Sequence, residues 1–163
     1  IFNQGNLAIP LGNGQNFVLE NARKDYHGLH RLARWQDSDA LYFFGYALSG
    51  YLSFPFVFPS FELVSASTYK TRSETWDLLT VDFPPEFDSH CRRQSFYFDA
   101  SGLLRRNDYH AEIISRMAMG AHYSFEYNLI NGIEVALQRR VFVRFGRSAT
   151  PMNALSADLK ILD

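Results

Sequence analysis

The chain has a single cysteine and almost no net charge. Cys91 is alone among 163 residues, so no intrachain disulfide can form and no cysteine-based zinc site can close. This cysteine usage suits a reducing compartment and predicts a cytoplasmic location. The net charge of −1 gives no broad positive field for nucleic acid or for an anionic membrane surface. We therefore expect no nucleic acid among its partners.

Familiar catalytic motifs are also missing. The sequence contains no Gly-rich phosphate loop, no nucleophile elbow and no zinc-protease helix motif. It has no internal repeat, low-complexity tract or interdomain linker, so we expect one domain over residues 1–163, with no cofactor and no metal. The chain opens at Ile1 on what reads as the tail of a strand, which predicts that an N-terminal portion of the domain is missing.

Aromatic residues are in excess. The chain has 15 Phe, 9 Tyr and 2 Trp, together 16% of its residues. Hydrophobic residues make up 47% and charged residues 20%, which excludes a disordered chain. Aromatic side chains in this number either fill a Phe-rich core or line the walls that hold an apolar ligand. Both interpretations stay open at this point.

One long segment, residues 40–61, carries no charge at all. Its apolar side chains recur at helical spacing, at Leu41, Phe44, Leu48 and Leu52. The length raises the possibility of a membrane span, but glycines, serines and three tyrosines dilute the segment, and Pro55 ends any helix just before it. We predict a helix over residues 40–54 that is apolar all round and is buried against a sheet, with no membrane span.

From residue 61 onward the apolar pattern repeats every second residue, which is typical of strands. The predicted strands cover residues 61–69, 75–83, 94–99, 103–114, 122–129, 133–145 and 155–161. Asn131-Gly132 is the strongest hairpin signal, and the side chains expected to be buried before it are Tyr123, Phe125, Tyr127 and Leu129. Sequential hairpins without a second helix predict a mainly β fold, a curved antiparallel meander sheet (half-barrel) wrapped around one apolar helix.

Several short motifs carry a resemblance to known proteins. They are Phe44-Gly45-Tyr46-Ala47-Leu48, His90-Cys91-Arg92-Arg93-Gln94, Phe96-Tyr97-Phe98-Asp99, Gly102-Leu103-Leu104-Arg105-Arg106, Asp108-Tyr109 and Ala121-His122-Tyr123. The chain resembles, over most of residues 40–144, uncharacterised bacterial proteins with half-barrel folds like those of lipoprotein carriers and of mycobacterial lipoproteins that hold lipids. The resemblance implies an apolar concave surface around a helix and an N-terminal extension, but no established activity.

A first polar cluster is expected where one strand begins. His90, Arg92 and Gln94 share parity with Phe96 and Phe98, so an extended strand would place them on one side. Such a set can bind a ligand head group, because the guanidinium of Arg pairs well with a carboxylate or phosphate. The alternative is a strand end whose Arg and Gln satisfy nearby carbonyl groups.

A second polar set falls on facing strands and contains Asp108, His110, His122 and Glu126. A His–carboxylate pair there could act as a general base, although a polar face alone gives this spacing. A zinc site from His90, His110 and His122 lacks the usual ligand spacing.

Arg139 is the most informative single residue. It interrupts an apolar run that includes Leu137 and Val141, so it must be paired while buried, or face a cavity. Asp108, Glu126 or a ligand anion can serve as its partner, and a structural ion pair is the favoured outcome. The candidate ligand-binding residues are therefore His90, Arg92, Gln94, Asp108, His122, Tyr123 and Arg139, with no catalytic or metal residue assigned.

Three functions follow as hypotheses. The first is a binding protein that holds an apolar small molecule or lipid in a half-barrel cavity. The second is a barrel-type isomerase or cyclase that uses a His–carboxylate pair. The third is an accessory subunit with a protein partner at a sheet edge, in residues 1–8 or 155–162.

Overall fold

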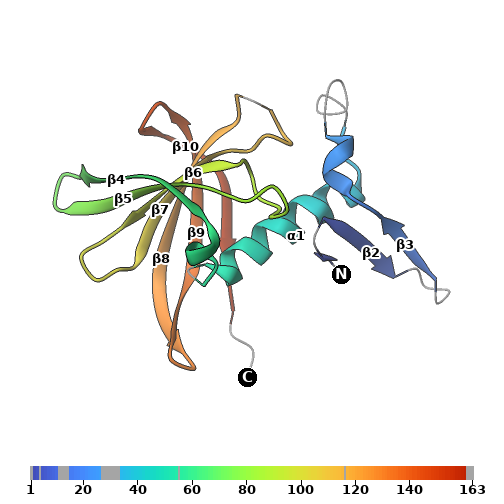
Figure 1. The fold of residues 1–163 in the computed structure, drawn as a ribbon, viewed down its shortest axis with the longest axis horizontal. Helices are drawn as coiled ribbons and strands as arrows, with labels where there is room; N and C mark the ends of the chain where they lie inside the picture. Colours follow the sequence, from blue (N-terminus) through green and yellow to red (C-terminus); the bar gives the residue numbers. More distant parts are fainter. Residues whose placement is uncertain are drawn as a thin grey trace.

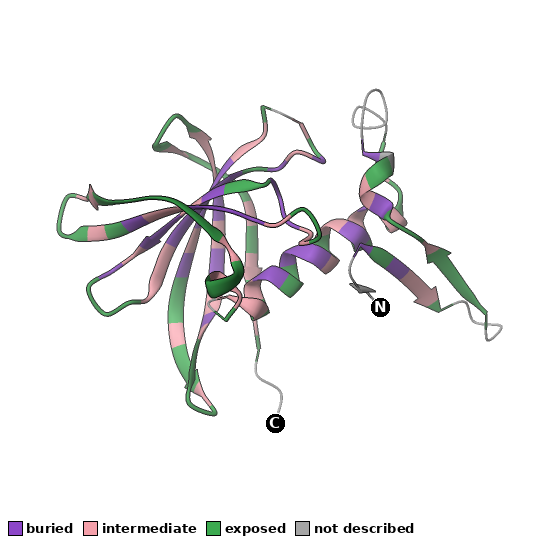
Figure 2. Cartoon of the chain, viewed as in Figure 1, coloured by how far each residue is buried: buried purple, intermediate pink, exposed green. Residues whose placement is uncertain are grey.

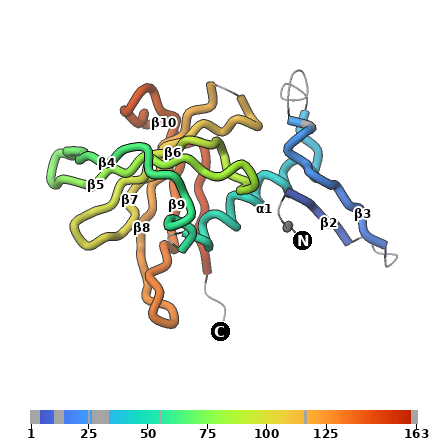
Figure 3. Tube along the Cα trace, in the orientation of Figure 1, coloured from blue at the N-terminus to red at the C-terminus, as the bar shows by residue number. Residues whose placement is uncertain are grey.

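The computed structural model of the chain describes residues 2–3, 5–10, 15–26, 34–54, 56–115 and 117–160. Within these ranges, a seven-stranded antiparallel sheet packs against a single α-helix, and a three-stranded sheet lies apart from it (Figure 1). The small sheet holds β1 (Phe2–Asn3), β2 (Asn6–Pro10) and β3 (Asn16–Leu19), and it is followed by the 3₁₀ turn η1 (Ala22–Asp25). In the tube view, β2 and β3 lie beyond the start of α1 (Asp37–Ser53), on the side away from the main sheet (Figure 3).

The main sheet is a meander, in which every strand pairs with its neighbours in the sequence. Its strands are β4 (Glu62–Lys70), β5 (Thr75–Asp82), β6 (Arg93–Phe98), β7 (Leu104–His110), β8 (Met119–Ile130), β9 (Ile133–Phe145) and β10 (Ser148–Asp158). The spatial order runs from β10 to β4 without a crossover, and all pairs are antiparallel. The predicted fold class is therefore confirmed. The sheet stays open, with β4 and β10 as its two edges.

The hairpins turn where glycine and asparagine predicted them. Asn131 and Gly132 have φ values of 50° and 83°, the left-handed pair that a two-residue hairpin of type I′ requires. At the β6–β7 turn, the Gly102 amide donates to the Asp99 carbonyl at 2.9 Å. The strand predicted over residues 103–114 is shorter than expected, because β7 ends at His110 and a turn follows. Ile161, predicted to close the last strand, lies outside the described residues.

The helix α1 begins at a capping box and ends before Pro55, which itself lies outside the described residues. The Gln36 side chain accepts from the backbone of Asp39, and the Gln36 amide donates to an Asp39 carboxylate oxygen at 2.7 Å. None of the helices in the described ranges combines the length and apolar character needed to cross a bilayer.

The prediction that α1 is buried all round is wrong, and the buried side is not the leucine stripe. Exposed side chains form one face of the helix, at Leu41, Phe44, Leu48 and Leu52. The buried face carries Tyr42 and Tyr46, which are 0% and 1% exposed, and Figure 2 shows buried positions along this helix in purple. Tyr42 donates to Asp88 at 3.0 Å, and the Tyr46 hydroxyl lies 3.0 Å from Nδ1 of His90. Tyrosine is preferred here because it combines a large apolar ring with a polar tip that can be paired.

The burial expected along β8 is wrong, although its pairing with β9 is confirmed. Ile130 faces Ile133 across the turn, yet Phe125 is 38% exposed and Leu129 67% exposed, whereas Ser124 is buried. The break occurs at Glu126, which has a φ of 51°. A left-handed residue within a strand rotates the chain locally. Tyr127, which follows it, therefore contacts the same cavity as Arg139 instead of lying beside Phe125.

Much of the aromatic excess fills the space between the main sheet and the segment that follows α1. Phe83 and Phe96 are 1% and 0% exposed, and Phe54, Phe58 and Phe61 pack against them. Their rings meet mostly edge to face at centroid distances between 4.2 and 6.3 Å. The Phe-rich core is therefore real, and the remaining aromatic residues are available to line a cavity.

Candidate functional site

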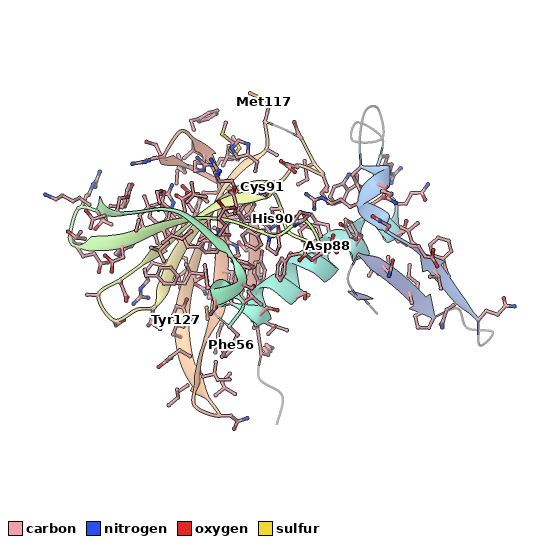
Figure 4. All side chains as sticks on the ribbon, in the orientation of Figure 1. Phe56, Asp88, His90, Cys91, Met117 and Tyr127 are labelled. Atoms are coloured by element: carbon pink, nitrogen blue, oxygen red, sulfur yellow. The ribbon has the colours of Figure 1, made fainter. Side chains whose placement is uncertain are left out.

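A cavity of about 380 Å³ lies on the helix-facing side of the main sheet, beside the C-terminal end of α1. Its walls come from α1 and the segment after it, from the β6–β7 turn and from the β8–β9 hairpin. The wall-forming side chains are mostly apolar: Tyr51, Leu52, Phe54, Phe56, Phe58, Phe98, Leu103, Leu104, Tyr127, Ile133, Val135 and Ala136. One carboxylate, that of the exposed Glu134, also lines the cavity. Figure 4 shows Phe56 and Tyr127 at this end of the molecule, away from His90 and Asp88. A volume of this size and an apolar wall with few polar groups are typical of small-molecule sites.

Arg139 is the positive charge of this cavity. It sits on β9 opposite Ser124 and is 8% exposed. Among the described residues, its guanidinium makes one hydrogen bond, from Nη1 to Oγ of Ser124 at 3.3 Å, and its Nε–H has no acceptor. The guanidinium carbon lies 4.4 Å from the centre of the Tyr51 ring, which is a cation–π contact. Arg139 therefore faces the cavity as a buried cation, with N–H donors that have no acceptor among the described residues.

The predicted ion pair of Arg139 with Asp108 or Glu126 is wrong. Asp108 points to the other face of the sheet. Glu126, whose backbone has a left-handed φ, is exposed to solvent. No carboxylate lies within ion-pair distance of Arg139 in the part of the chain that the structure describes. Burial without a counter-ion lowers the pKa of the Arg139 guanidinium from its ordinary value. Such a group costs free energy unless an anion joins it.

On the opposite face of the sheet, Asp108 belongs to a paired cluster around Arg106, which the sequence reasoning missed. Arg106 is 2% exposed and donates to both Asp108 oxygens, at 2.6 and 2.8 Å. It also donates to the Tyr123 hydroxyl at 3.1 Å, and the Tyr97 hydroxyl donates to Asp108 at 2.9 Å. Asp108 and Tyr123, both candidate ligand residues, are therefore engaged in binding the buried Arg106, and Asp108 also lies 3.6 Å from Nε of Arg144. In the sequence, nothing indicates which of the two neighbouring residues Arg105 and Arg106 is buried.

The expected cluster of His90, Arg92 and Gln94 does not form. β6 begins at Arg93, so strand parity does not reach back to residue 90. The Arg92 side chain is 65% exposed and lies 3.8 Å from Asp82. His90 and Gln94 are buried under α1, where Gln94 donates to the Cys91 carbonyl at 3.0 Å. The alternative interpretation, a strand end whose polar groups satisfy nearby carbonyls, accounts for Gln94.

His90 and His122 are two buried imidazoles joined by aromatic contacts. His90 stacks on Tyr109 at 3.9 Å, and His122 meets the edge of Tyr51 at 4.7 Å. The Nε2 atom of each has no hydrogen-bond partner in the described residues. Burial, with Arg23 nearby for His90, lowers the pKa of His90 to about 3. Burial, with Arg139 nearby, also lowers the pKa of His122 to about 3.

The His–carboxylate pair that an isomerase or cyclase would need is not assembled. His122 lies on the helix-facing side, whereas Asp108 lies on the other side with Arg106. His110 is exposed at the end of β7, and Glu126 is exposed as well. Groups of three or more potential metal ligands are likewise absent from the described ranges.

The structure thus brings together His122 and Arg139 from the candidate set, with Tyr51 between them. The sequence reasoning missed Tyr51 and Tyr127 as cavity residues. Tyr51 gave a signal, because a tyrosine in an otherwise apolar helix segment needs a polar neighbour. Tyr127 was singled out only for its alternation.

Comparisons with known proteins leave the relationship of the chain open. No protein-family model matches it, no curated protein sequence matches it, and no solved structure matches it. The resemblance to half-barrel proteins of the lipoprotein-carrier kind therefore stays a prediction.

Proposed function

We propose that the protein binds an apolar small molecule or lipid that carries one anionic group, with the apolar part in the cavity and the anion on Arg139. The observation that carries this proposal is the buried guanidinium of Arg139, which faces an aromatic-lined cavity of about 380 Å³ and has no carboxylate partner among the described residues. A carboxylate ligand would supply the missing counter-ion and accept hydrogen bonds from the free donors.

The size and shape of the cavity support a ligand with a chain or ring system of moderate size. Taking about 30 Å³ for a group the size of water, the cavity holds roughly a dozen such groups. Besides Arg139, the polar side chains of the wall are few: the Tyr127 hydroxyl already donates to the Leu104 carbonyl at 2.5 Å, and Glu134 is exposed. The ligand is therefore expected to be apolar apart from its one charged end.

Decanoate is a suitable probe, and decanol is its uncharged counterpart. The wild-type protein should bind decanoate more tightly than decanol in a calorimetric titration, because only decanoate can pair with Arg139. Arg139→Met should weaken decanoate binding about 10- to 100-fold, the worth of a charge-assisted hydrogen bond, and leave decanol binding nearly unchanged. Native mass spectrometry of protein purified without detergent should show a co-purifying anion that this variant loses.

The matched control is Arg140→Met. Arg140 is the next residue on β9, and its guanidinium donates to Asp158 at 2.8 Å on the surface away from the cavity. This variant should keep the wild-type preference for decanoate. If both variants bind decanoate as the wild type does, or if the wild type binds neither probe, the proposed function is wrong.

A further inference from the structure

A second hollow lies beside the ligand cavity on the same face of the sheet. It has a volume of about 480 Å³ and is lined by Phe58, Ala66, Ser67, Asp77, Leu79 and Phe98, over strands β4 to β6. The residues of α1 do not line it. Together with the first cavity, it more than doubles the volume open to a ligand on this face.

Two rings, Phe58 and Phe98, line both hollows and so form the wall between them. Phe98 is fixed in the sheet, where β6 pairs it with Asp77 on β5 and with Leu104 on β7. Phe58 comes from the short 3₁₀ turn η3 (Phe58–Ser60) in the connection between α1 and β4. Its ring is half-buried and meets Phe96 edge-on at 4.7 Å and Phe98 at 5.8 Å.

The distance from Arg139 to the wall formed by Phe58 and Phe98 limits the length of a ligand chain that fits between them. Arg139 lies on β9 and Phe98 on β6, three strand spacings away, which is about 14 Å along the sheet. A chain anchored at Arg139 therefore runs across β8 and β7 and meets the rings of Phe58 and Phe98. Beyond these rings, Ala66, Ser67 and Leu79 offer small or apolar surface, and the exposed Asp77 is the one charged residue that lines this hollow.

We propose that Phe58 limits the length of the apolar chain that the protein accepts, and that the ligand class is a medium-chain monocarboxylate of about ten to twelve carbons. This inference rests on the proposed function. With the ring in place, additional carbons must leave the cavity into solvent. Without the ring, the chain continues into the second hollow over β4 to β6.

The test measures affinity against chain length with saturated monocarboxylates from octanoate to octadecanoate. They are used below their micelle concentrations and compete with an anionic naphthalene dye. In the wild type, affinity should rise up to about twelve carbons and then level off. Phe58→Ala should bind hexadecanoate at least tenfold more tightly than the wild type does, and the ratio of hexadecanoate to decanoate affinity should rise with it.

Phe56→Ala is the matched control. Phe56 is 62% exposed and lines the first cavity but not the second hollow. It is only two residues from Phe58 in the sequence. Phe56→Ala should lower the affinity at every chain length, because it removes wall area from the first cavity, while the affinity still levels off at about twelve carbons. Phe98→Ala removes the same wall from the sheet side and should lengthen the accepted chain even if Phe58→Ala does not fold.

The outcomes separate the two proposals. If the wild type binds decanoate through Arg139 but Phe58→Ala and Phe98→Ala keep the wild-type chain-length profile, the length limit by Phe58 is overturned and the binding function stands. The limit is also overturned if wild-type affinity keeps rising to octadecanoate. If the wild type binds no carboxylate at all, the proposed function itself fails.

Discussion

The two buried histidines make stability depend on pH between pH 7 and pH 5, above the ordinary pKa values of the carboxyl groups. His90 is 5% exposed and His122 is 2% exposed, and the pKa of each is lowered to about 3. Burial is the main cause for both, and the positive charges of Arg23 and Arg139 add to it. In the unfolded chain both imidazoles return to their ordinary pKa of 6.5. Below that pH the two histidines bind protons in the unfolded state but stay neutral in the folded state. The free energy of unfolding therefore falls as pH decreases from 6.5 toward 3.

The magnitude follows from the two pKa values. At pH 5, protonation stabilises the unfolded state by about 2 kcal/mol for each histidine, and at pH 7 by only about 0.2 kcal/mol. The folded protein should therefore lose about 4 kcal/mol of unfolding free energy between pH 7 and pH 5, a large share of the stability of a typical domain. The lowered carboxyl pKa values, those of Asp82 and Asp99, start from 3.8, so these groups titrate below this window.

The assay is urea denaturation, followed by tryptophan fluorescence and far-UV circular dichroism, at half-unit steps from pH 7.5 to 5. His90→Phe and His122→Phe should each remove about half of the pH dependence, and the double variant should remove nearly all of the 4 kcal/mol. His110→Gln, at an exposed position on β7, should keep the wild-type slope. A wild-type unfolding free energy that is flat from pH 7 to 5, or a double variant with the wild-type slope, would refute this reasoning.

Three further predictions concern stability and are measured by the same urea titration at pH 7.5. Arg139→Met should unfold at or above the wild-type free energy, because an unpaired buried cation is removed; a loss of more than about 1 kcal/mol would contradict the account of that side chain. Asp108→Asn should cost about 3 to 5 kcal/mol, since it leaves Arg106 buried without its counter-charge, and a loss below about 1 kcal/mol would argue against a buried pair. Gly120→Ala should cost about 1 to 3 kcal/mol, because its Cβ would come within 3.1 Å of the Tyr109 ring; a neutral effect would mean that this ring can move aside.

The order of strands and turns was accessible from the sequence because its signals are local. Alternation over residues 75–83 and the Asn131-Gly132 pair each depend on a few neighbours along the chain, and β5 and the β8–β9 turn follow them closely. The antiparallel meander then follows from hairpins that join each strand to the next.

The position of side chains was less accessible, because it depends on contacts between distant segments. The leucine stripe of α1 satisfied every local criterion for a buried face, yet Tyr42 and Tyr46 are buried because Asp88 and His90 supply partners from another part of the chain. Likewise, the alternation of buried and exposed side chains along β8 is broken at Glu126 by a positive φ angle. No residue pattern in the sequence predicted this angle.

By itself, the sequence determined that this is a mainly β chain with one apolar helix, and that Arg139 is a charge on an apolar side needing an explanation. Only the tertiary structure decided what surrounds the Arg139 guanidinium. It places Asp108 with Arg106 on the opposite face and leaves Arg139 over Tyr51 beside a cavity. The physical reason is that strand parity fixes the face on which a charge lies, whereas its partner is fixed by the packing of α1 and of the strands around it.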